Sequence, residues 1–172
     1  EGIRAIEMAK SLVTTDSLTG LPNRRAYDSM LDASLSRAAR ENYEASGKNV
    51  ALILIDVNNF KFEANDKYGH PFGDGVLKYV ADALRHETRS IDDKFRLGGD
   101  EFAIIMAPLD PKEPEDFLAK LTQKIDSYVR KEITTNYPGK ISNISVSLGM
   151  SVYGKDAATK EELMVHADGA MY

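Results

Sequence analysis

The chain has 172 residues, of which 42% are hydrophobic and 28% are charged, with a net charge of −5 and no cysteine. This length suits one domain with a single core, and the lack of cysteine excludes disulfides and thiolate metal sites. The negative charge argues against a general nucleic-acid binder, which usually has a basic face, and no apolar run is long enough to span a membrane.

The first part of the chain is predicted to be helical on both sides of a turn. Residues 3–13 have a loose helical spacing, and we expect residues 1–15 to be the end of a helix that enters from an upstream domain. Turn and cap residues fill positions 16–23 and end that helix. A second helix is predicted from about Arg24 to Asn42.

A buried strand and a helix are predicted next. Val50–Ile55 is a continuous apolar run, the pattern of a central strand covered on both faces, and it ends at Asp56. Residues 57–72 are polar and aromatic, and the chain is expected to enter a short helix there. A longer helix is predicted from about Gly73 to Arg89.

Two glycines predict a β-hairpin. Lys94–Leu97 and Glu101–Met106 have strand patterns, and Gly98 and Gly99 lie between them. We expect a two-residue type I′ turn at these glycines, because that turn needs a positive φ at both central positions.

A helix over 115–134, an alternating strand over 144–152 and a last helix over 161–172 complete the predicted order. The sequence therefore predicts an α+β fold with a ferredoxin-like, palm-type βαββαβ core: helices flank an antiparallel central sheet, and a helical segment precedes it. A right-handed crossover makes the second strand parallel to the first, so we expect Asp56 beside Asp100 and Glu101 at one end of the sheet.

Carboxylates that converge in this way repel each other unless a cation lies between them. Oxygen ligands without Cys or His favour Mg²⁺ or Mn²⁺, and Mg²⁺ usually shares substrate phosphates. Lys61 and the backbone N–H groups after Asp56 are suited to a triphosphate, so the pattern indicates metal-assisted chemistry on a nucleoside triphosphate. The alternative, which is more common for such residues, is a turn-forming Asp56 beside a solvated hairpin.

Several motifs together resemble the GGDEF domain, the catalytic domain of diguanylate cyclases. Gly98–Phe102 is similar to the pentapeptide that gives the family its name. The other similar segments follow the family's order: DSLTGLPNRR at 16–25, DVNNFK at 56–61, NDKYGHPFGD at 65–74, SVSLG at 145–149 and HADGAMY at 166–172.

The resemblance implies an enzyme that condenses two GTP molecules into cyclic di-GMP and two pyrophosphates, with one GTP on each domain of a homodimer. It implies that residues 16–172 are the catalytic domain, truncated at its C-terminus and therefore weakly active or inactive as a fragment, and that residues 1–15 bring a signal from an upstream sensor domain. It also implies a cytoplasmic domain of a bacterial protein, leaves a membrane anchor in the parent protein open, and implies no nucleic-acid partner.

The resemblance also implies roles for the residues around the hairpin. Asp56, Asp100 and the carbonyl of Val57 would bind the metal, Mg²⁺ or Mn²⁺. Asp100 would take the proton of the 3′-hydroxyl, with Glu101 as a second candidate, and Lys61 would stabilise phosphate charge.

Asn65 and Asp74 are implied to bind the guanine edge, and His70 to contact the substrate from the same segment. From the residues alone, the alternatives are a helix cap for Asn65, a packed turn residue for His70 and an N-cap for Asp74. One residue more than usual separates Lys61 from Asn65. We expect this residue to bulge the helix and to displace Asn65 relative to Lys61.

Arg89 and Asp92 lie shortly before the double glycine and resemble the family's inhibitory RxxD site for product dimers. The alternative is a helix-end arginine with an unrelated turn aspartate. Two other functions stay open: a non-enzymatic receptor that binds cyclic di-GMP through these two residues, and a dimerising relay domain without a ligand.

Overall fold

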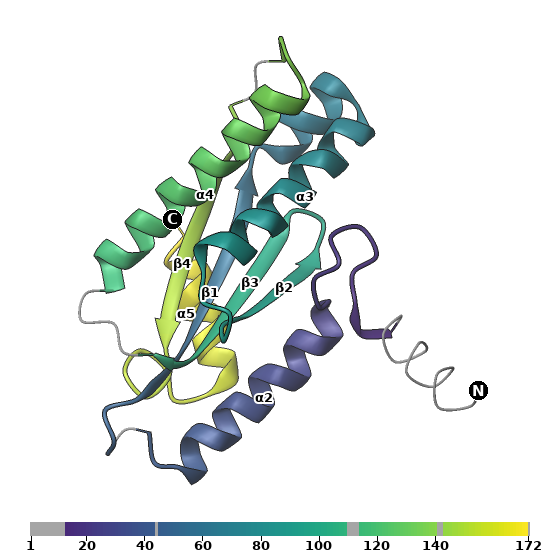
Figure 1. The fold of residues 1–172 in the computed structure, drawn as a ribbon. Coiled ribbons are helices and arrows are strands. Elements are labelled where there is room, and N and C mark those ends of the chain that lie inside the picture. The colour runs from purple at the N-terminus through teal and green to yellow at the C-terminus, as the bar shows by residue number, and fades with distance from the viewer. Residues whose placement is uncertain (1–12, 44, 110–113, 141–142, 172) are drawn as a thin grey trace.

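The computed structural model describes residues 13–43, 45–109, 114–140 and 143–171. The strands in these ranges are β1 (Asn49–Asn58), β2 (Asp93–Gly98), β3 (Glu101–Leu109) and β4 (Ser145–Val152). They pair antiparallel in one sheet with the order β2-β3-β1-β4 (Figure 1). This is the order of the ferredoxin-like core, so the predicted α+β fold class is confirmed.

Helices cover both faces of the sheet (Figure 1). One face carries α3 (His70–Glu87) and α4 (Pro114–Asn136), and the other carries α2 (Arg24–Arg40) and α5 (Lys160–Gly169). A short π-helix, η1 (Lys61–Asp66), connects β1 to α3. No helix in the described ranges is both long and apolar enough to cross a membrane.

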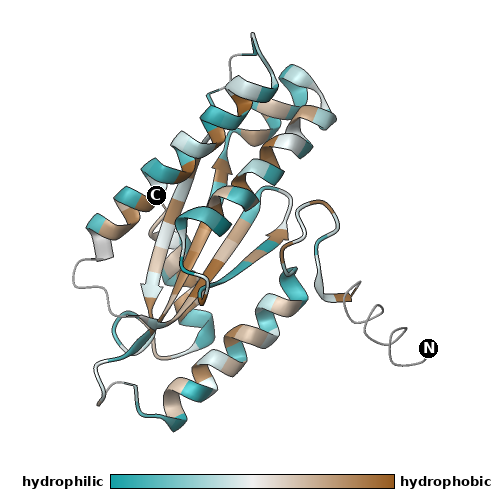
Figure 2. Ribbon diagram, in the orientation of Figure 1, coloured by the Kyte–Doolittle hydropathy of each residue, from teal (hydrophilic) through white to brown (hydrophobic). Residues whose placement is uncertain are grey.

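Side chains of β1 alternate between two apolar clusters. Ile53, Ile55 and Val57 pack under α3 and α4, whereas Val50 and Leu52 pack under α2 and α5. All five are fully or almost fully buried, and Figure 2 shows the hydrophobic strands between helices whose outer faces are largely hydrophilic. Because burial of each such side chain contributes about 1.5–3 kcal/mol, the two clusters fix β1 at the centre. The strand predicted to be covered on both faces is confirmed.

Helix α2 begins where it was predicted, whereas α3 begins earlier than predicted. The Asn23 side chain accepts a hydrogen bond from the Ala26 N–H (3.2 Å), so α2 begins at Arg24 as predicted. The predicted start of α3 is wrong: the helix begins at His70, three residues before Gly73. Pro71 is compatible with a helix here because its missing N–H falls in the first turn.

The hairpin turn lies one residue later than predicted. Gly98 pairs with Glu101, so the two turn residues are Gly99 and Asp100. Both glycines have positive φ (143° and 53°), but Asp100 does not. The type I′ prediction at Gly98–Gly99 is therefore wrong: Gly98 ends a bulged segment of β2, and the turn has positive φ only at its first residue. Asp100 is thus part of the turn itself.

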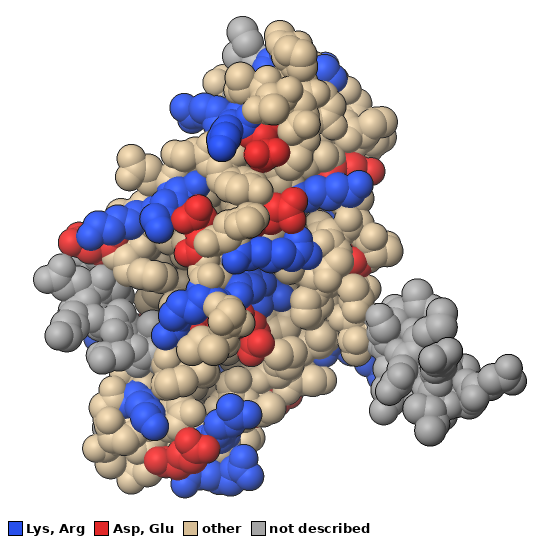
Figure 3. Space-filling view, in the orientation of Figure 1, with Lys and Arg blue, Asp and Glu red and all other residues tan. Residues whose placement is uncertain are grey.

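Helices are present at both ends of the described part of the chain. Val13 and Thr14 are helical, while the rest of the predicted incoming helix lies outside the described residues. Helix α5 ends at Gly169, short of the predicted Tyr172, which also lies outside them. On the face shown in Figure 3, basic and acidic side chains are interspersed.

Candidate active site

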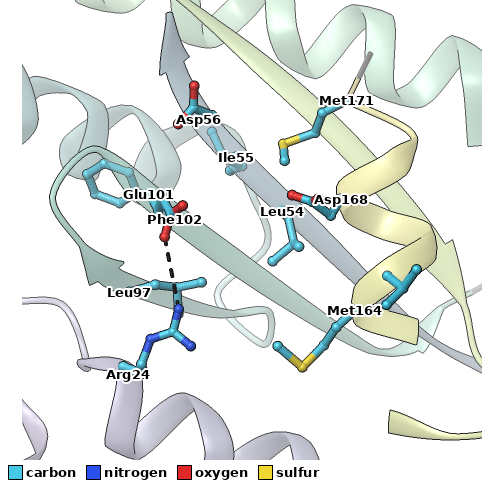
Figure 4. Close-up of a pocket in the computed structure, with 11 residues that line it drawn as sticks. Arg24, Leu54, Ile55, Asp56, Leu97, Glu101, Phe102, Met164, Asp168 and Met171 are labelled. Atoms are coloured by element: carbon cyan, nitrogen blue, oxygen red, sulfur yellow. Dashed lines mark ion pairs between the residues drawn. The ribbon is translucent and has the colours of Figure 1, made fainter. Parts of the chain in front are cut away.

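The carboxyl groups of the hairpin lie beside the end of β1. Asp56 is the pairing partner of Glu101 on β3, and the Val57 N–H donates a hydrogen bond to the carbonyl oxygen of Asp100 (3.2 Å). Asp56 and Glu101 are both on the α2/α5 side of the sheet (Figure 4). The structure therefore brings together the three acids that the topology predicted to converge.

A cavity of about 280 Å³ opens beside these acids, between the sheet, α2 and α5 (Figure 4). Its inner wall is apolar and includes Leu54, Leu97 and Met164, while Asp56 and Asp168 add negative charge. This volume is at the lower limit for a small-molecule pocket. A nucleoside triphosphate would therefore extend beyond the cavity and over the exposed sheet end.

Electrostatic repulsion is concentrated on Asp56. Burial raises the pKa of its carboxyl group, and the negative charges of Asp100, Glu101 and Asp168 raise it further. Because the surroundings of Asp56 disfavour its negatively charged form, a bound cation would be favoured beside it. Such perturbed groups cluster at functional sites.

The donor set fits a hard divalent cation. Asp56 and Asp100 offer carboxylate oxygens, and the described residues contain no cluster of three Asp, Glu, His or Cys side chains arranged to enclose an ion. Divalent cations such as Mg²⁺ normally keep part of their shell for water and phosphate oxygens, so a site with few protein carboxylates is compatible with one.

Glu101 has a cationic neighbour on α2. Arg24 Nη2 is 3.9 Å from Glu101 Oε2, and both side chains are more than half exposed. An ion pair this open contributes little to stability. The Glu101 carboxylate lies toward Arg24 of α2 (Figure 4).

Arg96 fixes the hairpin turn to the segment that precedes α2. Its guanidinium donates to the carbonyl oxygen of Gly99 (2.7 Å) and pairs with the Asp16 carboxylate (3.1 Å). Its backbone N–H donates to the Pro22 carbonyl oxygen (2.9 Å). One planar group with several donors thus ties the turn carrying Asp100 to the loop at 16–22.

The predicted substrate-binding residues follow β1 along η1 and α3. Lys61 is exposed at the first position of η1, and the Asn65 carboxamide lies in the space that a Cβ at Gly73 would occupy. His70 is the exposed first residue of α3, and Asp74 is exposed in the same helix. The N-cap alternative for Asp74 is wrong, since the helix begins four residues earlier.

Arg89 and Asp92 form a closed ion pair at the start of β2, the opposite end of that strand from the hairpin turn. Arg89 Nη2 is 2.6 Å from Asp92 Oδ1, and the Arg89 N–H donates to Asp92 Oδ2 (3.0 Å). Only 1% of the Asp92 side chain is exposed, against 47% for Arg89. The aspartate is therefore not an unrelated turn residue: it holds the Nε and Nη2 atoms of the arginine. Nη2 also donates to the Pro108 carbonyl oxygen (3.3 Å), and about half of the Arg89 side chain stays exposed.

The family model described as "Diguanylate cyclase, GGDEF domain" matches residues 13–172. The chain belongs to this family. It is 35% identical over 165 residues to the bifunctional diguanylate cyclase/cyclic di-GMP phosphodiesterase MucR of Pseudomonas aeruginosa, a match that covers 94% of this chain and 22% of MucR. It is 38% identical over 157 residues to the diguanylate cyclase TpbB of the same species, covering 91% of this chain and 34% of TpbB.

Solved structures agree with this assignment. The isolated GGDEF domain of TpbB from Pseudomonas aeruginosa has a TM-score of 0.73 and 34% identity, covering 92% of this chain and 86% of that one. The coiled coil and GGDEF domain of DgcB from Caulobacter crescentus, in complex with c-di-GMP, has a TM-score of 0.74 and 27% identity, covering 98% and 84%. This GGDEF chain spans between about a fifth and a third of MucR and TpbB.

The segment in which an additional residue was expected, between Lys61 and Asn65, is a π-helical turn. The predicted bulge is confirmed, since η1 has π-helical geometry from Lys61 to Asp66. In such a turn, residue i+5 takes the place that residue i+4 has in an α-helix. Phe60 and Ala64 remain buried on the core side, and Asn65 reaches the backbone of α3 next to Asp74.

Three residues around the hairpin acids were not predicted from the sequence: Arg24, Arg96 and Asp168. Each lies in or beside a motif, because Arg24 follows the cap Asn23, Arg96 precedes the double glycine, and Asp168 lies in the last helix. Their positions in or beside these motifs were the signal in the sequence that could have identified them as site residues. Their contacts depend on tertiary pairing and could not be derived from spacing.

Proposed function

We propose that this GGDEF domain condenses two GTP molecules into cyclic di-GMP and releases two pyrophosphates. The observation that carries the proposal is the meeting of Asp56, Asp100 and Glu101 at one sheet end, near the exposed Lys61 of η1. The names of MucR and TpbB support the same reaction. The donor chemistry of the site is that of metal-assisted phosphoryl transfer.

The carboxylates of Asp56 and Asp100 and the carbonyl of Val57 would hold Mg²⁺ or Mn²⁺, and the oxygen-only set favours Mg²⁺. When bound, such an ion neutralises charge on the phosphates and makes the α-phosphorus more electrophilic. Lys61 adds an exposed positive charge at the first position of η1.

In the reaction, the 3′-oxygen of one nucleotide forms a bond to the α-phosphorus of the other. The bond from that phosphorus to the bridging oxygen of pyrophosphate breaks, and the hydroxyl proton passes to the Asp100 carboxylate. We assign this role to Asp100 before Glu101, because Glu101 is already directed to Arg24. Two such steps close the ring.

One domain offers one set of acids and one guanine segment, with Asn65, His70 and Asp74. A symmetrical product made from two nucleotides therefore needs two domains that face each other, each presenting one GTP. We accordingly propose a homodimer as the active form. The exposed Asp74 and the half-buried Asn65 would accept and donate hydrogen bonds at the guanine edge.

Product inhibition is a further part of the proposal. Arg89 is held by Asp92 with about half of its side chain exposed, which suits a phosphate or a guanine face. The complex of DgcB with c-di-GMP supports product binding by this family. The buried Asp92 would act mainly through the orientation of Arg89.

The test is a turnover assay with purified protein, GTP and Mg²⁺, in which nucleotides and pyrophosphate are quantified by chromatography. The expected result is one cyclic di-GMP and two pyrophosphates per two GTP consumed, with a specific activity that rises with protein concentration until the dimer is saturated. A linear dinucleotide, or a specific activity independent of concentration down to the monomer range, would overturn the proposal.

A further inference from the structure

Two glycines flank Asp74 in the first turns of α3, although glycine is unfavourable inside a helix. Each lets another side chain approach the helix backbone. The Asn65 carboxamide occupies the space of a Cβ at Gly73, and the Tyr137 hydroxyl would lie 2.6 Å from a Cβ at Gly75. Tyr137 comes from the end of α4, far from Asn65 in sequence. The backbone of Asp74 is therefore enclosed from both sides.

Tyr137 belongs to a group of aromatic rings that pack edge to face around the start of α3. The ring of Phe72 makes edge contacts with Tyr68 and with Tyr137, both at 4.9 Å between centroids. Phe72 is 1% exposed, so it anchors the group in the core. Edge-to-face geometry of this kind is favourable beyond the area it buries.

The side chain of Lys140 lies against this group of rings. Its ammonium lies 5.1 Å from the ring centroid of Tyr68, 5.0 Å from that of Phe72 and 5.1 Å from that of Tyr137. A cation within about 6 Å of one aromatic face is already attracted to it. Here a single cation contacts three rings, which join the segment before α3, α3 itself and the end of α4.

A second contact ties the same connection to η1. The Asn143 N–H donates a hydrogen bond to Glu63 Oε2 (3.3 Å), and the carboxylate of Glu63 also pairs with Lys67 (3.2 Å). The segment between α4 and β4 is thus attached to both parts of the guanine segment: to η1 through Asn143 and to α3 through Lys140.

We propose that Tyr137 and Lys140 are positioning residues for base recognition, because their contacts with the rings of Tyr68 and Phe72 set Asp74 at the distance from Asn65 that selects guanine. This inference rests on the assignment of Asn65 and Asp74 in the proposed function. It extends the site to a connection that carries none of the family's motifs.

The test measures nucleotide binding rather than turnover, so that the positioning role and the proposed reaction can be refuted separately. The ligands are GTP with a methylene group in place of the α,β-bridging oxygen, and the inosine analogue, which lacks the 2-amino group. Lys140→Met removes the charge of the side chain and keeps its length, whereas Lys140→Arg keeps a cation. Lys48→Met is the matched control, because the Lys48 ammonium lies 5.7 Å from the centroid of the Tyr43 ring, outside the guanine segment.

We expect Lys140→Met to weaken binding of the guanine analogue by about three- to tenfold and of the inosine analogue by less, so that the preference for guanine shrinks. Lys140→Arg and Lys48→Met should stay within about twofold of the parent protein. Equal weakening of both analogues, or no weakening, overturns the inference. A parent protein that binds and discriminates but makes no cyclic di-GMP overturns the proposed reaction and leaves the positioning role standing.

A steric rescue gives an independent test. Gly75→Ala places a methyl group against the Tyr137 hydroxyl, whereas the ring carbons are 3.4 Å away and can be tolerated. Gly75→Ala should therefore reduce the guanine preference, and the double variant Gly75→Ala/Tyr137→Phe, which lacks that hydroxyl, should restore it. If the double variant discriminates no better than Gly75→Ala, Tyr137 does not position Asp74.

Discussion

Arg96 and Asp16 form an ion pair of 3.1 Å between positions 80 residues apart in the sequence. The same guanidinium donates to the carbonyl oxygen of Gly99, in the turn that carries Asp100. The position of the turn that carries Asp100 therefore depends on the loop that precedes α2. A change that weakens the pair is expected to affect both stability and turnover.

Asp16→Asn tests this pair through its pH dependence. Burial raises the pKa of Asp16, but hydrogen bonds from Thr19 and Arg96 outweigh this effect and hold the pKa below its usual value. A lowered pKa stabilises the fold above the unfolded value of about 3.8 and ceases to do so as pH falls through the folded value. We expect the variant to be less stable by about 1–2 kcal/mol at pH 7, with a gap that closes below pH 3.8.

Urea unfolding at pH 7, 5 and 3 measures this gap. Asp82→Asn is the matched control, because Asp82 pairs with Arg85 at 2.7 Å on an open helix surface and is expected to contribute less than about 0.5 kcal/mol. A gap for Asp16→Asn that is the same at pH 3 as at pH 7 would contradict the account.

Asp56→Asn is predicted to separate stability from activity. The substitution removes a charge that is repelled by Asp100, Glu101 and Asp168. The melting temperature of the nucleotide-free protein should rise by about 1–4 °C, while turnover should fall by at least about 100-fold because the carboxylate proposed to bind the metal is lost. Calorimetric melting and a turnover assay check both, with the exposed Asp66→Asn as the control. A lower melting temperature for Asp56→Asn would refute the repulsion argument.

Much of the frame around these acids was predictable, because it depends on local patterns. The apolar run of β1 and the strand patterns on either side of the double glycine predicted the sheet and the convergence of Asp56 with Asp100. The turn was misplaced by one residue, since two adjacent glycines satisfy a type I′ turn in sequence while the bulge before Gly98 is a property of the paired strands.

Other features depended on contacts between distant segments. Gly69 and Pro71 are residues typical of loops, so the sequence predicted a later start for α3. In the folded structure the helix has already begun at His70, and Phe72 in its first turn is buried in the core. Neither the Arg96–Asp16 ion pair nor the contacts of the Lys140 ammonium with aromatic rings correspond to a periodic pattern in the sequence. They follow from which loops the folded sheet brings together.

Deletion of Phe62 tests the role of the π-helical turn. Phe62 is 69% exposed in η1, so its removal costs little burial and should convert the turn to α-helical geometry. Asn65 would then follow Phe60 by four residues and lie on the same face, so the KM for GTP should stay within about threefold. Insertion of an alanine after Phe62 should instead rotate Asn65 away from Gly73 and raise the KM by about tenfold or more. A large loss of GTP binding in the deletion variant would show that the π-turn itself is required.

Arg89→Ala is predicted to relieve product inhibition. The exposed edge of Arg89 is lost, while the hairpin at the other end of β2 is unaffected. Progress curves should lose their early decline, and added cyclic di-GMP should inhibit at least about tenfold less strongly. Arg130→Ala, at an exposed position of α4, is the control. Unchanged inhibition of the Arg89 variant would place the product site elsewhere.

The most direct test of the central claim compares wild-type protein with Asp100→Ala in GTP and Mg²⁺, with cyclic di-GMP and the melting temperature measured on the same samples. Asp100 lies in a two-residue turn outside both apolar clusters, so its loss should leave the melting temperature within about 2 °C. We predict that wild-type protein forms cyclic di-GMP and that the variant forms at least about 1,000-fold less. Comparable product from both proteins, or a collapse of the fold in the variant, would contradict the account.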